Sequence, residues 1–252
     1  MKRYIIVLLA GILMAMSVQA AFAKGPIVVK ALPVTISVPG QYILGGNLIS
    51  ASSGIEAITI TADNVVFDMG GYGIKGQDSG TATGIYVIGL GVEIRNGFVT
   101  DFYNGIVSSG VGTRAINVRS YSNNNYGIEL EGDGSLAKDC MVEDNTAAGI
   151  LLAKGAATGN IVHGNSVGIS ASGSRCTVTG NAVYDNNAGI SCGPGSLIAD
   201  NVVYGNVATY GIASTAGYCF VNNNAVYNNG GGSLGNLVLS GSGNVTGVNL
   251  AP

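Results

Sequence analysis

Residues 149–191 read GILLAKGAATGNIVHGNSVGISASGSRCTVTGNAVYDNNAGIS, in which a Gly-Ile pair, a Gly/Ser turn, an Asn and a Val-containing run return in order. The same sequence motif recurs on both sides of this stretch. Its Gly-Ile pairs begin at Gly54, Gly84, Gly105, Gly127, Gly149, Gly168, Gly189 and Gly211. Neighbouring pairs are separated by 30, 21, 22, 22, 19, 21 and 22 residues. A nearly fixed period of this size is typical of a solenoid, in which stacked repeats bury a core that one repeat cannot bury alone.

The runs that follow the Gly-Ile pairs alternate in the manner of strands, as in Ile128-Glu129-Leu130-Glu131 and Ile169-Ser170-Ala171-Ser172. A period of two indicates strands that turn one face inward. Helices are disfavoured because Gly and Asn interrupt the chain too often. Two or three short strands with their turns fill one period. The sequence therefore predicts an all-β fold, a single-stranded right-handed parallel β-helix of about eight to nine coils with an N-terminal cap.

Two columns of residues are expected along such a β-helix, because matching positions of successive coils stack about 4.8 Å apart. We expect all eight Gly-Ile pairs to match, with their Ile side chains inward. Seven of these isoleucines form the clearest apolar column: Ile85, Ile106, Ile128, Ile150, Ile169, Ile190 and Ile212. A polar column is expected at Asn160, Asn181, Asn201 and Asn224, with Asn117 and Asp139 before them. Amides stacked at a turn can hydrogen bond to the coils above and below.

Three segments are expected along the chain. Residues 1–23 have a basic start, an apolar run and the small-x-small sequence Ala21-Phe22-Ala23, which together predict a signal peptide. Residues 24–53 hold three of the five prolines and predict an N-terminal cap over an otherwise open strand edge. Residues 54–252 would form the β-helix, with a loop projecting near residues 77–83 because the first interval is longer than the others.

Charge and localisation limit the partners. The formal net charge is −3, and removal of Lys2 and Arg3 with the signal peptide gives −5. This charge disfavours nucleic acid and anionic membrane surfaces as partners. The apolar run of the signal is short for a membrane span, which needs about 20 residues. We therefore expect a secreted or periplasmic protein that is not inserted in the membrane after cleavage, of undetermined oligomeric state.

A family resemblance is carried by residues 64–76, NVVFDMGGYGIKG, and by the later units Gly134-Ser135-Leu136 and Gly195-Ser196-Leu197. These stretches resemble secreted right-handed parallel β-helix repeat proteins of the pectate-lyase-like superfamily. The resemblance implies a protein that acts on or binds polysaccharide, as a lyase, a hydrolase or a sugar-binding relative. A non-catalytic structural or surface-display solenoid is the alternative, since fold does not imply function. Whether the chain is an enzyme stays open at this stage.

The charged residues gather in residues 93–145, so an acid–base site is expected there. Glu129 and Glu131 alternate with inward Ile128 and Leu130 and should both face outward, with their Cα atoms about 6.6–7 Å apart. That spacing suits the paired carboxylates of inverting glycoside hydrolysis, which lie roughly 6.5–9.5 Å apart. Glu129, Glu131, Asp133 and Arg119 are therefore the candidate catalytic residues, with Asp133 and Arg119 as expected neighbours of the pair. Two solvated glutamates on a strand are the alternative interpretation.

No metal site and no cofactor are expected from the residues themselves. The resemblance implies Ca²⁺, which prefers six to eight oxygen ligands. Asp139, Glu143 and Asp144 lie in one coil, but no neighbouring coil supplies a second acidic row. Ca²⁺ is therefore kept only as a weakly supported cofactor.

The single histidine and three tyrosines share a register. His163, Tyr184, Tyr204 and Tyr227 each lie three residues after an Asn of the polar column. If the neighbouring valines point inward, these four side chains form an outward aromatic strip. Such a strip suits sugar binding, because an aromatic ring offers a flat apolar face with a polar tip. It equally suits stacking of one coil on the next without a ligand.

Four cysteines raise the question of disulfides, which export permits. Cys176 and Cys219 share a register, but one coil lies between them and places them about 9.6 Å apart. A disulfide needs Cα atoms within about 4.4–6.8 Å. Cys192 should lie inward, stacked with Ala171 and Ser214. We therefore predict four free thiols and no cysteine metal site.

Overall fold

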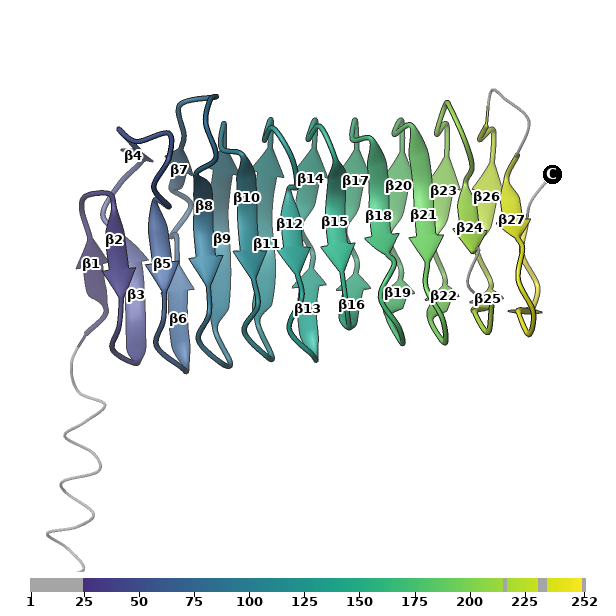
Figure 1. Ribbon diagram of the computed structural model, residues 1–252, viewed down its shortest axis with the longest axis horizontal. Coiled ribbons are helices and arrows are strands. Elements are labelled where there is room, and N and C mark those ends of the chain that lie inside the picture. Colours follow the sequence, from purple (N-terminus) through teal and green to yellow (C-terminus); the bar gives the residue numbers. More distant parts are fainter. Residues whose placement is uncertain (1–24, 215–216, 231–234, 251–252) are drawn as a thin grey trace, which may run out of the picture.

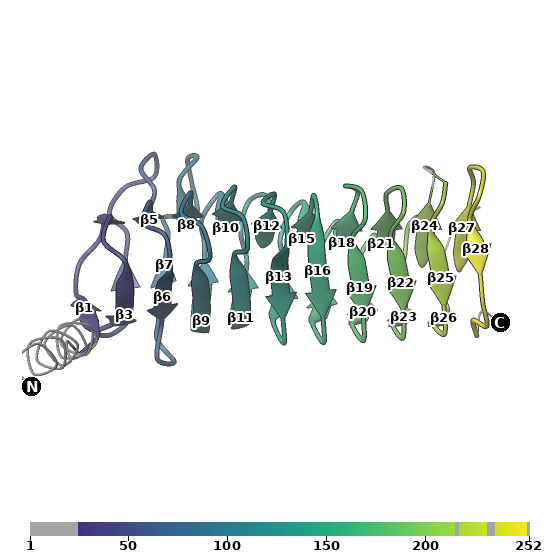
Figure 2. The same ribbon diagram turned by 90° about the horizontal axis from the view of Figure 1, so that it is seen from below.

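The computed structural model describes residues 25–214, 217–230 and 235–250, which form a rod of stacked coils (Figure 1). All strand pairs along the rod are parallel and fall into a 10-stranded and an 18-stranded sheet. Figures 1 and 2 show that one coil follows the next along the axis, with β1 and β28 at opposite ends. The chain is thus a right-handed parallel β-helix, as expected. The expected signal peptide lies outside the described residues.

Each coil has up to three faces. The first face is the 10-stranded sheet, with one strand from each coil. Its strands are β2 (Val34–Ile36), β5 (Ile58–Ile60), β8 (Thr83–Val87), β10 (Asn104–Ser108), β12 (Ile128–Leu130), β15 (Ala148–Leu152), β18 (Val167–Ala171), β21 (Ala188–Cys192), β24 (Ile212–Ser214) and β27 (Leu237–Leu239). The strands from β5 onward lie within residues 54–252, which confirms the expected eight to nine coils.

The 18-stranded sheet bends into the second and third faces. Strands of the second face are β1 (Ile27–Val29), β3 (Gly40–Leu44), β6 (Val65–Asp68), β13 (Ser135–Lys138), β16 (Gly155–Thr158), β19 (Thr177–Thr179), β22 (Leu197–Ala199), β25 (Phe220–Asn222) and β28 (Val245–Thr246). Strands of the third face are β4 (Leu48–Ile49), β7 (Gly73–Lys75), β14 (Met141–Glu143), β17 (Ile161–His163), β20 (Ala182–Tyr184), β23 (Val202–Tyr204) and β26 (Ala225–Tyr227). Two longer strands, β9 (Glu93–Thr100) and β11 (Arg114–Tyr121), continue through both faces.

The core contains the expected column of isoleucines on the first face. Register pairs link Ile85, Ile106, Ile128, Ile150, Ile169, Ile190 and Ile212 from coil to coil, and all are fully buried. The prediction is wrong for the first Gly-Ile pair of the chain, Gly54-Ile55, which does not match the other seven in register. Ile58, not Ile55, pairs with Ile85, and Ile55 is exposed. The first coil therefore contains a longer turn before β5, which shifts its Gly-Ile pair out of register.

The polar column is a buried ladder at the bend between the second and third faces. In it Asn160, Asn181, Asn201 and Asn224 each bond the next amide along the rod, and Asn249 extends the row. The assignment of Asn117 and Asp139 to this ladder is wrong. Val118 and Cys140 occupy the ladder positions, and Asn117 and Asp139 lie one residue earlier with left-handed φ values of 52° and 53°. Asn and Asp tolerate that conformation, which explains their presence at the bend.

A second ladder, not foreseen from the sequence, closes each coil between the third and first faces. Each amide of this ladder donates through Nδ2 to the Oδ1 of the next. Its members are Asn123, Asn145, Asn165, Asn186, Asn206 and Asn229. Burying an amide is tolerated only when its hydrogen bonds are made, and here each rung supplies them to its neighbours.

The cysteines behave as the register predicts. Cys176 and Cys219 are separated by Ser196 of the intervening coil, whose Oγ accepts from the Cys176 amide at 3.1 Å. Cys192 pairs with Ala171 and Ser214. All four cysteines are buried and free in the described chain, which confirms the expected thiols. Over the same residues, no helix is long and apolar enough to cross a membrane.

Candidate functional site

The outward surface of the third face carries one continuous column of side chains. Register pairs connect, in order along the rod, Tyr121, Glu143, His163, Tyr184, Tyr204 and Tyr227. Alternation along each short strand explains their orientation, because the preceding Val142, Val162, Val183, Val203 and Val226 are fully buried. The expected aromatic strip therefore exists from His163 to Tyr227, and the outward column continues two coils earlier through Glu143 and Tyr121.

Glu143 is the polar centre of this column. Its Oε1 accepts from Arg119 Nε at 2.5 Å, and its Oε2 lies 3.1 Å from His163 Nε2. Glu143 is only 8% exposed, so both contacts are partly shielded from water. The Arg119 guanidinium also lies 4.3 Å above the Tyr121 ring, a distance that permits a cation–π contact. The result is a carboxylate held between a guanidinium and an imidazole.

The aromatic rings stack on one another. Centroids are 5.0 Å apart between His163 and Tyr184, 5.1 Å between Tyr184 and Tyr204, and 5.3 Å between Tyr204 and Tyr227, with interplanar angles of 13°, 13° and 6°. Each ring face is therefore turned largely toward its neighbour, as in the second of the two interpretations above. The three phenol hydroxyls have no hydrogen-bond partner within the described residues. Burial, with Tyr204 and Asp185 nearby, raises the pKa of Tyr184, so its hydroxyl stays protonated at neutral pH.

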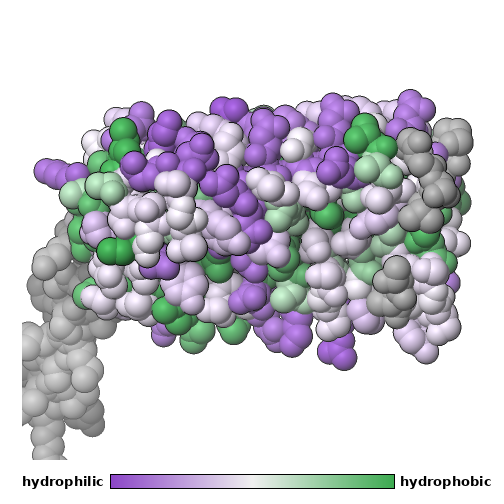
Figure 3. Space-filling model, turned by 45° about the horizontal axis from the view of Figure 1, so that its top comes forward, coloured by the Kyte–Doolittle hydropathy of each residue, from purple (hydrophilic) through white to green (hydrophobic). Residues whose placement is uncertain are grey.

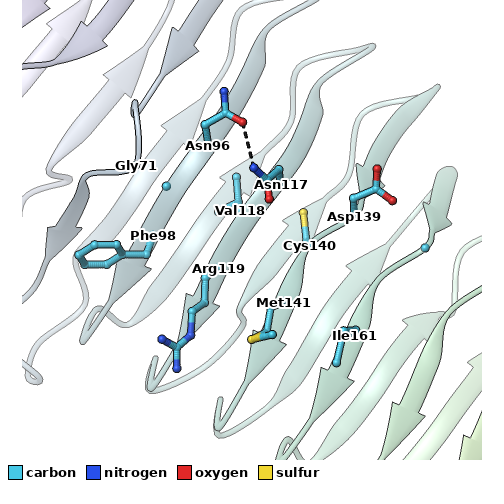
Figure 4. A pocket seen from close by; sticks show the side chains of 12 residues that line it. Gly71, Asn96, Phe98, Asn117, Val118, Arg119, Asp139, Cys140, Met141 and Ile161 are labelled. Carbon is cyan, nitrogen blue, oxygen red and sulfur yellow. Dashed lines mark hydrogen bonds between the residues drawn. The ribbon is translucent and has the colours of Figure 1, made fainter.

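A hollow of about 490 Å³ adjoins this column (Figure 4). Figure 4 shows Phe98, Arg119, Met141 and Ile161 in a row on successive strands, with Asn96, Asn117 and Asp139 along the neighbouring bend. Asn117 Nδ2 donates to Asn96 Oδ1 at 3.0 Å. The hollow thus combines an apolar floor with amide and carboxylate groups at one edge, a composition common in small-molecule and sugar sites.

The structure separates one of the four candidate catalytic residues, Arg119, from the other three, which lie on β12 and in the turn after it. Glu129 lies outward on β12, beside Val107 and Leu151 of the adjacent coils, and Glu131 follows the strand. Burial, and secondly Glu131, raise the pKa of Glu129, so the two carboxylates influence each other. Asp133 is in the following turn, where Lys154 Nζ lies 3.3 Å from its carboxylate. The first face is thus the location of the glutamate pair.

Arg119 is not a neighbour of Glu129 and Glu131, as the sequence had suggested. It belongs to β11 of the 18-stranded sheet, and β12 belongs to the 10-stranded sheet. Because outward side chains of different faces diverge, Arg119 contacts Glu143 instead. Sequence reasoning missed Tyr121 and considered Glu143 only as a possible Ca²⁺ ligand, not as a partner of Arg119 and His163. The signal was available, since Glu143 lies one coil before His163 in the same register.

The fold defines a parallel β-helix protein. The chain belongs to the NosD family, described as "Periplasmic copper-binding protein (NosD)", whose sequence pattern matches residues 56–244. A periplasmic family agrees with the expected export. Among curated proteins, no sequence matches the chain.

Solved structures with a similar fold include three carbohydrate-related or viral chains. Geobacillus virus E2 ORF18 is 15% identical with a TM-score of 0.70, and the alignment covers 88% of this chain and 51% of that one. The Azotobacter vinelandii mannuronan C-5 epimerase AlgE4 A-module is 11% identical with a TM-score of 0.58, covering 88% and 86%. Pectate lyase Pel9A is 18% identical with a TM-score of 0.56, covering 93% and 72%. This chain spans about half of the viral chain, and at these identities the likeness shows the fold alone.

Copper, which the family description names, does not fit the side chains that the structure describes. Copper sites in proteins use Cys, Met and His ligands, and the cysteines must be deprotonated. The sequence has one histidine, and its Nε2 already contacts Glu143. Burial raises the pKa of Cys140 to about 12 and also raises the pKa values of Cys176 and Cys192. In residues 25–214, 217–230 and 235–250, no three His, Cys, Asp or Glu side chains converge as metal ligands do.

The acidic residues considered for Ca²⁺ also diverge. Glu143 is taken up by Arg119 and His163, and Lys138 Nζ lies 3.8 Å from Asp139. Asp144 follows Glu143 in a left-handed turn and is exposed. The absence of a resident cofactor therefore stays a prediction, and no chemical step is derived through a metal.

Proposed function

We propose that this exported β-helix protein binds a polysaccharide along its third face, between Tyr121 and Tyr227. The observation that carries the proposal is the outward column that repeats one side chain per coil. It joins the Arg119–Glu143–His163 cluster to a row of phenol hydroxyls that have no hydrogen-bond partner among the described residues. Solved neighbours of the same fold are named as a mannuronan epimerase and a pectate lyase, so this fold serves polysaccharide chemistry elsewhere.

The spacing of the column suits an extended polymer. Ring centroids repeat every 5.0 to 5.3 Å, close to the advance of one extended pyranose unit along a glycan. A polysaccharide lying parallel to the rod axis therefore meets a phenol hydroxyl at each coil and can exchange a hydrogen bond with it. The hollow lined by Phe98, Met141 and Ile161 offers apolar contact for the C–H faces of a sugar ring.

The test is a binding screen of the purified mature chain against a panel of polysaccharides, followed by a variant that removes only the hydroxyls. The triple variant Tyr184→Phe, Tyr204→Phe and Tyr227→Phe keeps the stacked rings. Each lost hydrogen bond contributes about 0.5–1.5 kcal/mol, so the triple variant is expected to bind roughly tenfold or more weakly. Tyr86→Phe is the matched control, because Tyr86 is a half-buried tyrosine of the first face. Equal binding by the triple variant and the wild type refutes the site.

The competing function is a non-catalytic structural or surface-display rod. The stacking of the rings favours it, because stacked aromatic side chains stabilise neighbouring coils without any ligand. The two functions differ in the screen. A rod binds no polysaccharide, and its tyrosine hydroxyls are dispensable.

Catalysis on the first face is a second proposal, favoured by the environment of Glu129. A carboxyl group with a raised pKa suits a general acid, and a nearby ionised carboxylate suits a general base. In this proposal one glutamate of the pair is the acid, the other is the base, and Asp133 borders the site. Arg119 takes no part in it, because it is paired with Glu143 on the third face. Replacing Glu129 and Glu131 singly with Gln is expected to lower turnover of a cleaved glycan by about 10²-fold or more. Unchanged turnover in both variants moves the reaction away from this pair.

A further inference from the structure

The charged residues around the C-terminal part of the third face are all acidic. From residue 176 to the end, the sequence contains no Lys, Arg or His, and its two acidic residues are Asp185 and Asp200. Asp185 directly follows Tyr184, and Asp200 lies at the bend that precedes β23. Both are exposed, with left-handed φ values of 52° and 59°. The tyrosine row is therefore bordered by these two carboxylates, and residues 176–252 contain no basic side chain that could offset them.

The two columns of turns that contain Asp185 and Asp200 hold further carboxylates nearer the N-terminal end of the rod. Asp139 and Asp200 occupy one column at the bend before the third face, with Gly159 and Gly180 between them. Asp144 and Asp185 occupy the turn after the third face, where each immediately follows a member of the outward column. Two acidic residues thus lie at each long edge of the third face. Figure 3 shows that hydrophilic residues gather along one margin of the rod.

The cations that could offset these charges are already engaged. Eight Lys and Arg side chains fall in the described residues, and six of them pair with Asp or Glu. Arg119, which lies on the third face, is bound to Glu143 at 2.5 Å. The other two, Lys30 and Arg175, follow β1 and precede β19, away from the tyrosine row. A polyanion lying on the third face would therefore meet carboxylates without meeting unengaged cations.

From this distribution we infer that the third face selects an uncharged polysaccharide and discriminates against polymers of uronic acids. The inference rests on the proposed function and names its substrate class. Repulsion between one pair of exposed charges is modest in water, but a polyuronate carries a carboxylate on every sugar unit and therefore meets each of the four edge carboxylates in turn. Over several units the effect reaches roughly tenfold or more in affinity. Phenol hydroxyls, in contrast, bind sugar hydroxyls without regard to charge.

The experiment compares an uncharged 1,4-linked glucan or mannan with alginate and polygalacturonate of matched length, at low and high salt. The uncharged polymer is expected to bind at least roughly tenfold more tightly, and its affinity should be insensitive to salt. Residual binding of the uronate polymers should strengthen as salt rises, because salt screens repulsion. Tighter uronate binding that weakens with salt overturns the inference and leaves the proposed function standing. Binding of neither class refutes the proposed function itself.

The double variant Asp185→Asn and Asp200→Asn tests the origin of the selectivity. Asn adopts the left-handed conformation of both positions, so the turns are preserved. Affinity for polygalacturonate is expected to rise severalfold while affinity for the uncharged polymer stays constant. Asp63→Asn with Asp78→Asn is the matched control, because it removes the same charge from turns at the N-terminal end of the rod. An equal gain in the control variant, or no gain in the test variant, overturns the inference.

Discussion

Asn181 is the position at which the stability of the β-helix can be tested most sharply. Its Nδ2 donates to Ala157 O at 3.0 Å, to Thr179 O at 3.2 Å and to Asn201 Oδ1 at 2.9 Å. Its Oδ1 accepts from the backbone and side-chain nitrogens of Asn160, both at 2.9 Å. The residue is 1% exposed, so water cannot replace these partners. Asn181→Ala leaves several buried groups unsatisfied, and each costs about 1–3 kcal/mol.

Allowing for relaxation of the ladder, we expect Asn181→Ala to lower the free energy of unfolding by about 3–6 kcal/mol, a large share of the roughly 5–15 kcal/mol typical of a folded domain. Urea denaturation followed by far-UV circular dichroism measures this loss. Asn187→Ala is the control, since Asn187 is exposed six residues later and its loss should change stability by less than about 0.5 kcal/mol. A loss in Asn181→Ala no larger than in the control refutes the view that the ladder holds the coils together.

Two further predictions concern titratable groups. The pKa of Glu129 is raised above its ordinary value of 4.5. Ionisation of this carboxyl therefore lowers the stability of the folded state as the pH rises from the ordinary pKa through the raised one. Glu129→Gln should therefore be more stable than wild type at neutral pH, and the difference should vanish in acid below that ordinary value; a constant difference contradicts the assignment. The buried thiols, with the pKa of Cys140 raised to about 12, should resist alkylation at neutral pH in the folded protein. Mass spectrometry after unfolding without reductant should then find four alkylated cysteines, and any linked pair contradicts the register.

The fold followed from the sequence because a solenoid repeats its local rules. Each Gly-Ile pair from Gly84 onward carries the same turn and the same inward side chain, so the period alone placed Ile85 and Ile212 in one column. The prediction failed where local spacing departed from the period. Ile55 left the column because its coil holds a longer turn, and Asn117 was displaced from the amide ladder by one residue.

The candidate site depended on information that alternation does not contain. Alternation predicted that Glu129 and Glu131 face outward, and Arg119 was expected beside them. Outward directions on different faces diverge, however, and only the bend of the sheets decided which side chains meet. That bend separated Arg119 from the glutamates and brought it to Glu143 and Tyr121. The sequence by itself determined the parallel β-helix, its inward isoleucines and the register of His163 with the tyrosines. The tertiary structure alone decided the contact of Glu143 with Arg119, because the register partner of Glu143 is Tyr121 and Arg119 reaches it only diagonally across the stacked coils.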